Sequence, residues 1–375
     1  MNVLANLESG KSESIEWKQL WSLAALYASI VLGWIAYHNY QPKLLTQFNF
    51  TQFNLLLLVA QGIILSATPP IAGKLGDRFR FKQGHRLPII SAGISFAAMI
   101  FMSVAFTLFA NPNEVFKWIL PILIIFWLIA MSIFTSPALS TLELFTPVEK
   151  LPRAMAILTI VANLVYSLEP IIIDLIDYLG APITFMVGGI AVLGSGYALR
   201  KNSLSLFNKG RDEKPKTDFK IDTQKSEYGF ILICGISLGF VTTILFNYFP
   251  TILGAKLAGL TNGFDGKWVL VAMLVLSAII SLPISNGVNK FGTLKAFWVS
   301  SAVSLLSMGL LFSLENSVAL LVAIVLFTIA FTVQSVSSLP LAISRANYYE
   351  KVYCVGIFFS GVAIPDGIVE VIRAL

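Results

Sequence analysis

Two carboxylates stand inside long apolar stretches of the sequence, each beside a proline, and are the strongest candidates for chemistry. They are Glu169 and Asp366. At about 1.5 Å per residue, a helix places them roughly 22–24 Å from the basic residues Arg153 and Lys351. Within a hydrocarbon layer about 30 Å thick, a carboxylate is costly and usually faces a polar interior. We expect one of the two, Glu169 before Asp366, to bind a cation or a polar solute. The alternative is that both lie near the outer headgroups of a bilayer.

A second set of candidates is charged and lies at the ends of apolar stretches. Asp77 and Arg78 are adjacent in a short basic loop that also holds Gly73. Exposed ion pairs contribute little, but a network that forms in only one conformation can bias an equilibrium by about a few kcal/mol. The alternative is a solvated loop whose charges only set the orientation of the chain. The expected partners at neighbouring helix ends are Glu143, Arg153 and Arg345.

The sequence contains a pattern similar to the phosphate-binding loop of soluble enzymes, but without the structural context that such a loop needs. Residues 5–12 read Ala-x-x-x-x-Gly-Lys-Ser. A phosphate-binding loop needs a strand before it and a helix after it, and only four residues precede this segment. The two cysteines, Cys234 and Cys354, lie in apolar stretches and match no metal-ligand spacing. We therefore expect no nucleotide, cofactor or metal site, and no enzymatic activity.

Composition indicates which elements must hold these residues. Of the 375 residues, 56% are hydrophobic and 12% are charged, with a mean hydropathy of +0.79. A soluble domain carries about 25% charged residues, so the chain is predicted to be a membrane protein in contact with a lipid bilayer. The net charge of +6 collects in loops, which indicates membrane orientation and not nucleic-acid binding.

Eleven stretches are long and apolar enough to cross a bilayer as helices, which takes roughly 20 residues. The predicted fold is therefore an all-α polytopic membrane protein. The expected spans are 19–40, 52–73, 87–109, 116–140, 154–178, 181–199, 228–254, 268–289, 294–313, 317–342 and 352–373.

A charged stretch divides the spans into two groups. Residues 200–227 are rich in Lys, Asp, Glu and Ser, and predict a solvated linker. It separates an N-terminal half of six spans, 19–199, from a C-terminal half of five spans, 228–375, while residues 1–18 form a polar tail. The halves repeat each other weakly, and a complete repeat would include a twelfth span. An eleven-span variant and a truncated form are both open.

The basic residues predict the orientation. With the N-terminus in the cytoplasm, 21 of the 26 Lys and Arg residues fall on the cytoplasmic side and 5 on the outer side. Short loops that stay in the cytoplasm carry an excess of Lys and Arg. We expect a multi-pass protein of the cell membrane with a cytoplasmic N-terminus and linker.

The basic loop resembles the one between the second and third helices of major facilitator superfamily transporters. Gly73, Leu75, Asp77 and Arg78 match that motif, although Arg80 stands where the family often has glycine. The branch of sucrose/proton and glycoside–pentoside–hexuronide:cation symporters is the most similar. The residues that carry this finer likeness are Gly84, Arg86, Pro88, Glu143 (where an aspartate is usual), 338–343 and 356–366.

The resemblance implies a secondary transporter whose two halves rock around a central site. It implies a gating role for the network around Asp77 and Arg78, a small, sugar-like polar solute, and coupling to protons or sodium. In this family the first, fourth, seventh and tenth helices line the cavity. The candidates for that lining are Trp34, Tyr37, His38, Gln61, Trp127, Asn163, Asn247, Tyr248 and Gln334.

Two other functions remain open. The 28 phenylalanines suit an efflux transporter of amphipathic compounds. A protein of the same fold that has lost transport, acting as a sensor or persisting as a remnant, is the other alternative.

Overall fold

The computed structural model describes residues 14–50, 53–110, 116–209, 225–261 and 265–374. Throughout these ranges the regular elements are helices. The long ones are α2 (Trp17–Gln47), α3 (Asn54–Gln83), α4 (Leu87–Phe109), α5 (Ile119–Leu139), α7 (Leu151–Ser167), α9 (Ala181–Lys209), α10 (Tyr228–Asn247), α12 (Gly266–Phe291), α13 (Thr293–Ser313), α14 (Ser317–Ser344) and α15 (Lys351–Ala374). The short ones are α6 (Leu142–Phe145), α8 (Glu169–Leu179), α11 (Phe249–Thr261) and the 3₁₀ turns η2 (Phe116–Trp118), η3 (Val148–Lys150) and η4 (Tyr348–Glu350).

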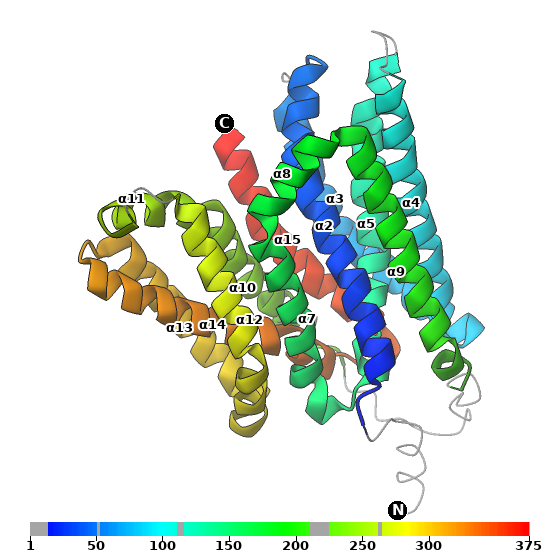
Figure 1. The fold of residues 1–375 in the computed structure, drawn as a ribbon. Helices are drawn as coiled ribbons and strands as arrows, with labels where there is room; N and C mark the ends of the chain where they lie inside the picture. The colour runs from blue at the N-terminus through cyan, green and yellow to red at the C-terminus, as the bar shows by residue number, and fades with distance from the viewer. Residues whose placement is uncertain (1–13, 51–52, 111–115, 210–224, 262–264, 375) are drawn as a thin grey trace, which may run out of the picture.

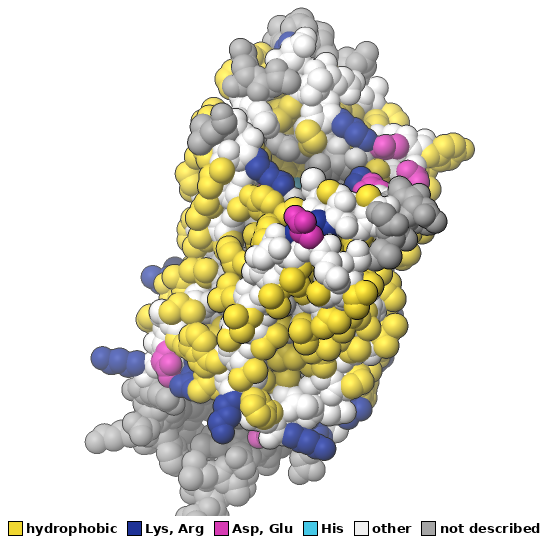
Figure 2. Space-filling model, turned by 90° about the vertical axis from the view of Figure 1, so that its left-hand side faces the viewer, with side chains coloured by type: hydrophobic (Ala, Val, Ile, Leu, Met, Phe, Trp, Pro, Cys, Tyr) yellow, Lys and Arg dark blue, Asp and Glu magenta, His cyan; other side chains and the backbone are white. Residues whose placement is uncertain are grey.

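Within the described ranges, ten helices are long and apolar enough to cross a membrane. The number is eleven when the bent pair α7 and α8 is taken as one span. The predicted all-α membrane fold is therefore confirmed. Figure 2 shows a broad hydrophobic surface, with Lys, Arg, Asp and Glu side chains gathered toward its two ends. A helical bundle with such a belt satisfies its own backbone hydrogen bonds inside lipid.

The helices form two groups that meet along the middle of the molecule (Figure 1). The first group is α2 to α9, and the second is α10 to α15. The last helix, α15, packs along α3 of the first group and α10 of the second. The groups also touch where α7 packs on α12 and α14. Any site between the halves is bounded by these contacts.

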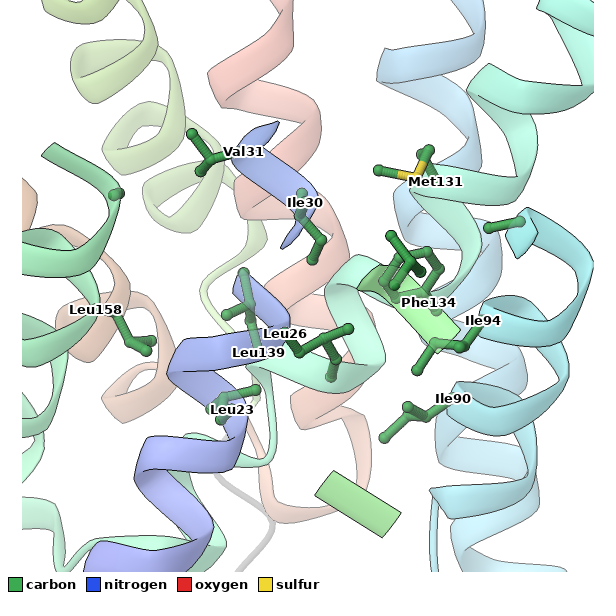
Figure 3. Packing of buried hydrophobic residues seen from close by; sticks show 14 of the residues in the cluster. Leu23, Leu26, Ile30, Val31, Ile90, Ile94, Met131, Phe134, Leu139 and Leu158 are labelled. Atoms are coloured by element: carbon green, nitrogen blue, oxygen red, sulfur yellow. The ribbon is translucent and has the colours of Figure 1, made fainter. Parts of the chain in front are cut away.

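The apolar core consists of one large cluster, centred on the first half, and a smaller separate cluster in the second half. In the first half, Leu26 of α2 lies beside Leu139 of α5, and Phe134 of α5 lies beside Ile94 of α4 (Figure 3). A separate cluster in the second half joins α10, α11, α12 and α14, and Phe249 stacks edge-on against Phe327 at 4.7 Å between ring centroids. The larger cluster also includes residues of α10, α14 and α15, so the two halves share part of their core.

Two helices are longer than the sequence predicted. The expected loop around Asp77 and Arg78 is helical, because α3 continues to Gln83 and ends where Gly84 adopts a left-handed φ of 82°. The first ten residues of the expected linker extend α9 to Lys209. Buried Ser203 and Phe207 hold that extension against the bundle. Apolar length marks where a helix leaves the hydrocarbon, and not where the helix ends. Residues 210–224 of the linker lie outside the described residues.

Glycines set the close contact between α3 and α15. A Cβ on Gly73 would lie 2.5 Å from the Val352 carbonyl oxygen and 2.7 Å from the Tyr353 Cα. Farther along the pair, Gly356 lies against Pro69, and Gly62 lies against Gly367. Small residues at such positions let the helix backbones approach each other closely. This seam is the longest contact between the two halves.

Two expected spans are broken instead of straight. The span predicted at 154–178 bends by 56° between α7 and α8 at Leu168. The span predicted at 228–254 breaks between α10 and α11 at Tyr248. In each case a proline, Pro170 or Pro250, is the second residue of the new helix. Proline lacks the amide proton that would continue the hydrogen-bond ladder, so it favours the start of a new helix.

Candidate functional site

A cavity of about 810 Å³ lies between the two halves. Its walls come from α2, α3, α5, α7 and α8 on one side and from α10, α11, α12 and α15 on the other. This volume is within the range of small-molecule sites. The exposed side chains of Asp174, Asp265 and Lys267 stand at its rim. At the opposite end of the molecule, the contact between α3 and the start of α15 closes it.

Acidic side chains outnumber basic ones among the described residues that line this cavity. The carboxylates come from three elements: Glu169 and Asp174 of α8, Asp265 before α12, and Asp366 and Glu370 of α15. The lining also holds Lys267 and His38. A cavity of this composition attracts cations and repels anions.

Asp366 and Glu370 are one helical turn apart on α15, and each accepts a hydrogen bond from a side-chain amide. The amide that bonds Asp366 belongs to the second half, and the amide that bonds Glu370 belongs to the first half. Asn247 Nδ2 donates to Asp366 Oδ1 at 3.0 Å. Gln61 Nε2 donates to Glu370 Oε2 at 2.7 Å. The hydroxyl of Tyr37 in turn donates to Gln61 Oε1 at 2.6 Å. The amides therefore hold the carboxylates of α15 in fixed positions.

Arg373 adds positive charge near this pair, and His38 lies beside it. His38 lies close enough to Asp366 to interact with it electrostatically. Arg373 Nη1 donates to Asn247 Oδ1 at 2.8 Å, and its Nη2 donates to the Asn247 carbonyl. The pair is thus partly compensated on the side that faces the rim.

Glu169 is the first residue of α8, directly after the bend. Its carboxylate interacts electrostatically with Lys267 of the other half. In the described part of the chain, no donor forms a hydrogen bond to it. Because the broken helix leaves room around it, this carboxylate faces the cavity without a fixed partner.

Aromatic rings form much of the remaining wall. Trp34 packs edge-on against Trp127 and lies parallel to His38, with centroid distances of 5.1 and 5.8 Å. Tyr166 meets Phe246 across the two halves at 4.8 Å. The rings that line the cavity are those of Tyr27, Trp34, Tyr166, Phe246, Trp268 and Phe359.

Some of the residues predicted to line the cavity do so in the structure, and others lie elsewhere. Trp34, His38, Gln61, Asn247, Glu169 and Asp366 line the cavity. Tyr37 and Trp127 are stacked 4.6 Å apart behind this wall, where Trp127 is fully buried. The buried Asn163 and Gln334 donate to Ser277 and Ser237 instead. The ring of Tyr248 lies under the Arg373 guanidinium.

At the closed end, Asp77 joins the two halves. Its carboxylate accepts hydrogen bonds from the backbone amides of Val352 at 3.2 Å and Tyr353 at 2.8 Å. These amides belong to the first turn of α15, where the first N–H groups of a helix lack internal partners and the dipole favours negative charge. Asp77 thus caps α15 from the neighbouring half.

Glu143 is the centre of an ion-pair cluster beside this cap. Its carboxylate lies 2.8 Å from Arg86, 2.7 Å from Lys351 and 4.0 Å from Arg80. The Arg86 side chain is only 1% exposed. Burial lowers the pKa of its guanidinium while Glu143 opposes that shift, and an arginine stays charged at physiological pH. Because Lys351 begins α15, the cluster also links the two halves.

Three residues expected in this network lie elsewhere. Arg78 and Arg153 are exposed, and Arg153 stands over the ring of Trp17. Arg345 forms an ion pair with Glu227 at 2.8 Å. The charges around Glu143 come instead from Arg80, Arg86 and Lys351.

The sequence analysis did not single out Glu370 or Lys267. Glu370 follows Asp366 by four residues in one apolar stretch, which places both on one helix face. That spacing was the available signal. No comparable signal marks Lys267, because its position facing Glu169 depends on how the halves pack. The described residues contain no group of three or more His, Cys, Asp or Glu side chains suited to a metal.

Comparisons with known proteins agree with this architecture. The human organic anion transporter MFSD10 (TETRAN) has a similar structure, with a TM-score of 0.66 and 13% identity over 96% of this chain and 93% of that one. A bacterial homologue of the iron transporter ferroportin, in an outward-facing state with soaked iron, gives a TM-score of 0.63 and 15% identity over 96% and 91%. At these identities the likeness shows the fold alone. None of the curated proteins compared with the chain matches it in sequence.

A comparison of the sequence with models of protein families identifies the family. The sequence model of the Major Facilitator Superfamily matches residues 8–365, which is nearly the whole chain. The two-half helical bundle, the central cavity and the Gly73–Arg78 motif fit that match. The chain therefore belongs to the major facilitator superfamily, a family of membrane transporters and not of enzymes.

Proposed function

We propose that this protein is a secondary active transporter that moves a small polar solute by alternating access. The observation that supports this most is the asymmetry of the molecule. The central cavity is open at the rim formed by Asp174, Asp265 and Lys267, while the contacts of Asp77 and Glu143 close the other end. A transporter needs one end closed while the other is open, with the site between its halves.

The excess of basic residues supports a cytoplasmic location for the closed end. Arg80, Lys82 and Arg86 lie there, as do Lys150 and Lys351. With the N-terminus in the cytoplasm, the rim of the cavity faces the outside of the cell membrane. The conformation is then outward-open, and the interhalf contacts at Asp77 and Glu143 act as the cytoplasmic gate.

The carboxylates that face the cavity are the proposed coupling site. Glu169, at the bend between α7 and α8, has no hydrogen-bonded partner among the described residues and is the first choice for binding a proton or sodium. Asp366 is the second choice, since Asn247 holds one of its oxygens. Neutralising a carboxylate inside a membrane lowers the cost of moving it through a closed state.

The nature of the solute is the least constrained part of the proposal. The sequence resemblance favours a sugar-like solute, and the aromatic rings of Tyr27 and Trp34 suit the apolar faces of a sugar. However, both cavity amides, Gln61 and Asn247, already hold carboxylates. Efflux of amphipathic compounds is the second candidate, because it is favoured by the aromatic wall. The organic anion named for the similar human transporter does not fit the acidic lining.

Uptake by reconstituted vesicles tests both the transport and the coupling. The purified protein is reconstituted into lipid vesicles, and a proton or sodium gradient is imposed across their membrane. The accumulation of sugars, nucleosides, organic acids and amines inside the vesicles is then measured. For the accumulated solute, we expect Glu169→Gln to abolish gradient-driven accumulation while downhill exchange persists, since the cation site is lost and the cavity remains. Asp177→Asn is the matched control, because Asp177 pairs with Lys43 outside the cavity.

Unchanged accumulation in Glu169→Gln would remove Glu169 from the coupling mechanism. A protein that accumulates and exchanges no solute under any gradient would contradict the transport proposal itself.

A further inference from the structure

The charge of the cavity is not balanced by the protein around it. Its described lining includes five carboxylates, of which Asp174 and Asp265 are exposed at the rim, but only Lys267 and His38 can carry positive charge. Arg373 stands nearby, and its guanidinium is held by Asn247 and the ring of Tyr248. Uncompensated carboxylates inside a membrane protein are costly unless a positive group binds among them. A neutral sugar would leave this imbalance, and an anion would increase it.

The pair on α15 presents its free oxygens to the cavity. Asn247 occupies Asp366 Oδ1, and Gln61 occupies Glu370 Oε2. Among the described residues, no donor forms a hydrogen bond to the second oxygen of either carboxylate. Two negative oxygens one helical turn apart, on side chains already held in place, form a preorganised site for a positive group.

The surroundings favour an organic cation over a bare metal ion. Hard cations such as Ca²⁺ and Mg²⁺ take six or more oxygen ligands. The amides near this pair direct N–H groups at the carboxylates, and their own oxygens already accept from Tyr37 and Arg373. The nearby wall is aromatic instead, and ring faces attract organic cations through their quadrupoles.

We propose that the substrate is an organic cation whose charged group binds at Asp366 and Glu370 and whose apolar body packs on the rings of Trp34, Tyr27 and Tyr166. The inference deepens the proposed function, because it names the solute class of the same cavity. The cavity of about 810 Å³ has room for a body of several rings.

Equilibrium binding to the purified full-length protein in detergent tests this proposal without any gradient. The probes are tetraphenylphosphonium and tetraphenylborate, which have nearly the same size and aromatic surface but opposite charge. We expect saturable binding of the phosphonium at one site per chain, at least about tenfold tighter than the borate, because two carboxylates attract one probe and repel the other. Equal or tighter borate binding, or no saturable phosphonium binding, overturns the proposal.

A pair of variants locates the site. Combining Asp366→Asn with Glu370→Gln keeps the side-chain shapes and removes the charges, and we expect phosphonium binding to weaken at least about tenfold. Asp177→Asn removes a carboxylate outside the cavity and should leave the affinity unchanged. If the double variant keeps the wild-type affinity for the phosphonium, the cation does not bind at Asp366 and Glu370, and the proposal is contradicted. The comparison of the two probes on the wild-type protein stands even if the double variant does not fold.

The outcomes separate this inference from the transport proposal. Phosphonium binding without gradient-driven uptake of any solute would keep the cation site and remove transport. Uptake of a neutral solute by a protein that binds no phosphonium would support transport and contradict the cation site.

Discussion

At the scale of single residues, the position of Asp77 explains why this carboxylate, and not its neighbour Arg78, is the one proposed to act in the gate. Asp77 is 6% exposed and accepts two backbone N–H groups from α15, whereas Arg78 is exposed. Hydrogen bonds to a charged group contribute about 1.5–3 kcal/mol each, and both are lost when the halves separate at this end. Asp77 therefore contributes to the contact between the halves at this end, together with the ion pair of Glu143 and Lys351.

Asp77→Asn should lower the turnover of transport about tenfold or more and change solute affinity much less. An asparagine cannot accept from two amides with both side-chain atoms, so the closed gate is weakened while the distant cavity is untouched. Initial uptake rates and equilibrium binding on the same preparation measure the two effects. Arg78→Gln is the control and should behave as wild type. Normal turnover in Asp77→Asn would show that the cap has no part in gating.

Glu143→Gln should destabilise the protein by about 3–5 kcal/mol, because it removes the carboxylate that forms ion pairs with buried Arg86 and with Lys351. Thermal unfolding in detergent would show the loss as a lower transition temperature. Glu149→Gln, at an exposed position six residues later, is the matched control and should have no effect. If the two variants unfold alike, the cluster does not contribute to stability.

How much the sequence could predict differs from residue to residue. Glu169 and Asp366 stand out because a charge interrupts an apolar stretch, and both line the cavity. Tyr37 and Trp127 have the same composition signal as Trp34, but the stacking of helices puts them one layer behind it. The identity of an aromatic residue does not reveal its direction on a helix, so such positions required the structure.

At the scale of helices, hydropathy located the spans but not their breaks and extensions. The stretches 154–178 and 228–254 read as continuous because bending at Leu168 and Tyr248 changes no apolar residue. The prolines were visible in the sequence, yet many helices contain prolines without breaking, as α14 does at Pro340. The helices that follow the two breaks, α8 and α11, pack mainly on helices of their own half. The sequence alone does not show this packing.

The seam between α3 and α15 allows a direct test at this scale. Gly73→Ala should lower stability by about 1–3 kcal/mol and reduce transport, because the new methyl group meets backbone atoms that cannot move independently. Gly309→Ala in α13 is the control, since a Cβ there meets nothing within 4 Å. We expect the control to be neutral or slightly stabilising, as alanine favours a helix. Thermal unfolding and uptake rates measure both variants. Equal stability of the two would show that the seam tolerates side chains.

At the scale of the whole molecule, the charged stretch 200–227 and the weak repeat predicted two halves, and the resemblance in the Gly73–Arg78 segment predicted the superfamily, which the family match confirms. The closer likeness to sugar symporters rested on short motifs at helix ends. Most of those motifs lie away from the cavity, and only the stretch 356–366 contributes lining residues, among them Phe359 and Asp366. A likeness that rests mainly on residues outside the cavity carries little information about what the cavity binds. Substrate class depends on which side chains from nine helices meet in one place.

The orientation of the whole molecule can be tested by cysteine labelling in intact cells. Both native cysteines are buried, so a single new cysteine gives the signal. Tyr178 is 87% exposed near the rim end, and Lys290 is exposed at the gate end. In intact cells, a membrane-impermeant maleimide should label Tyr178→Cys and should not label Lys290→Cys. After the membrane is permeabilised, it should label both. The opposite pattern would mean that the cavity faces the cytoplasm.

The acidic lining of the cavity also has an electrical consequence. Carboxylates within the hydrocarbon layer lie in the field of the membrane potential, where moving one elementary charge through 100 mV changes the energy by about 2.3 kcal/mol. Under the proposed mechanism, halves that rock with the cavity empty and ionised carry net negative charge through part of that field. When bound cations neutralise the lining, the same movement transfers little charge. The return of the empty protein is therefore the step that a membrane potential speeds or slows, and the loaded step is nearly insensitive to it.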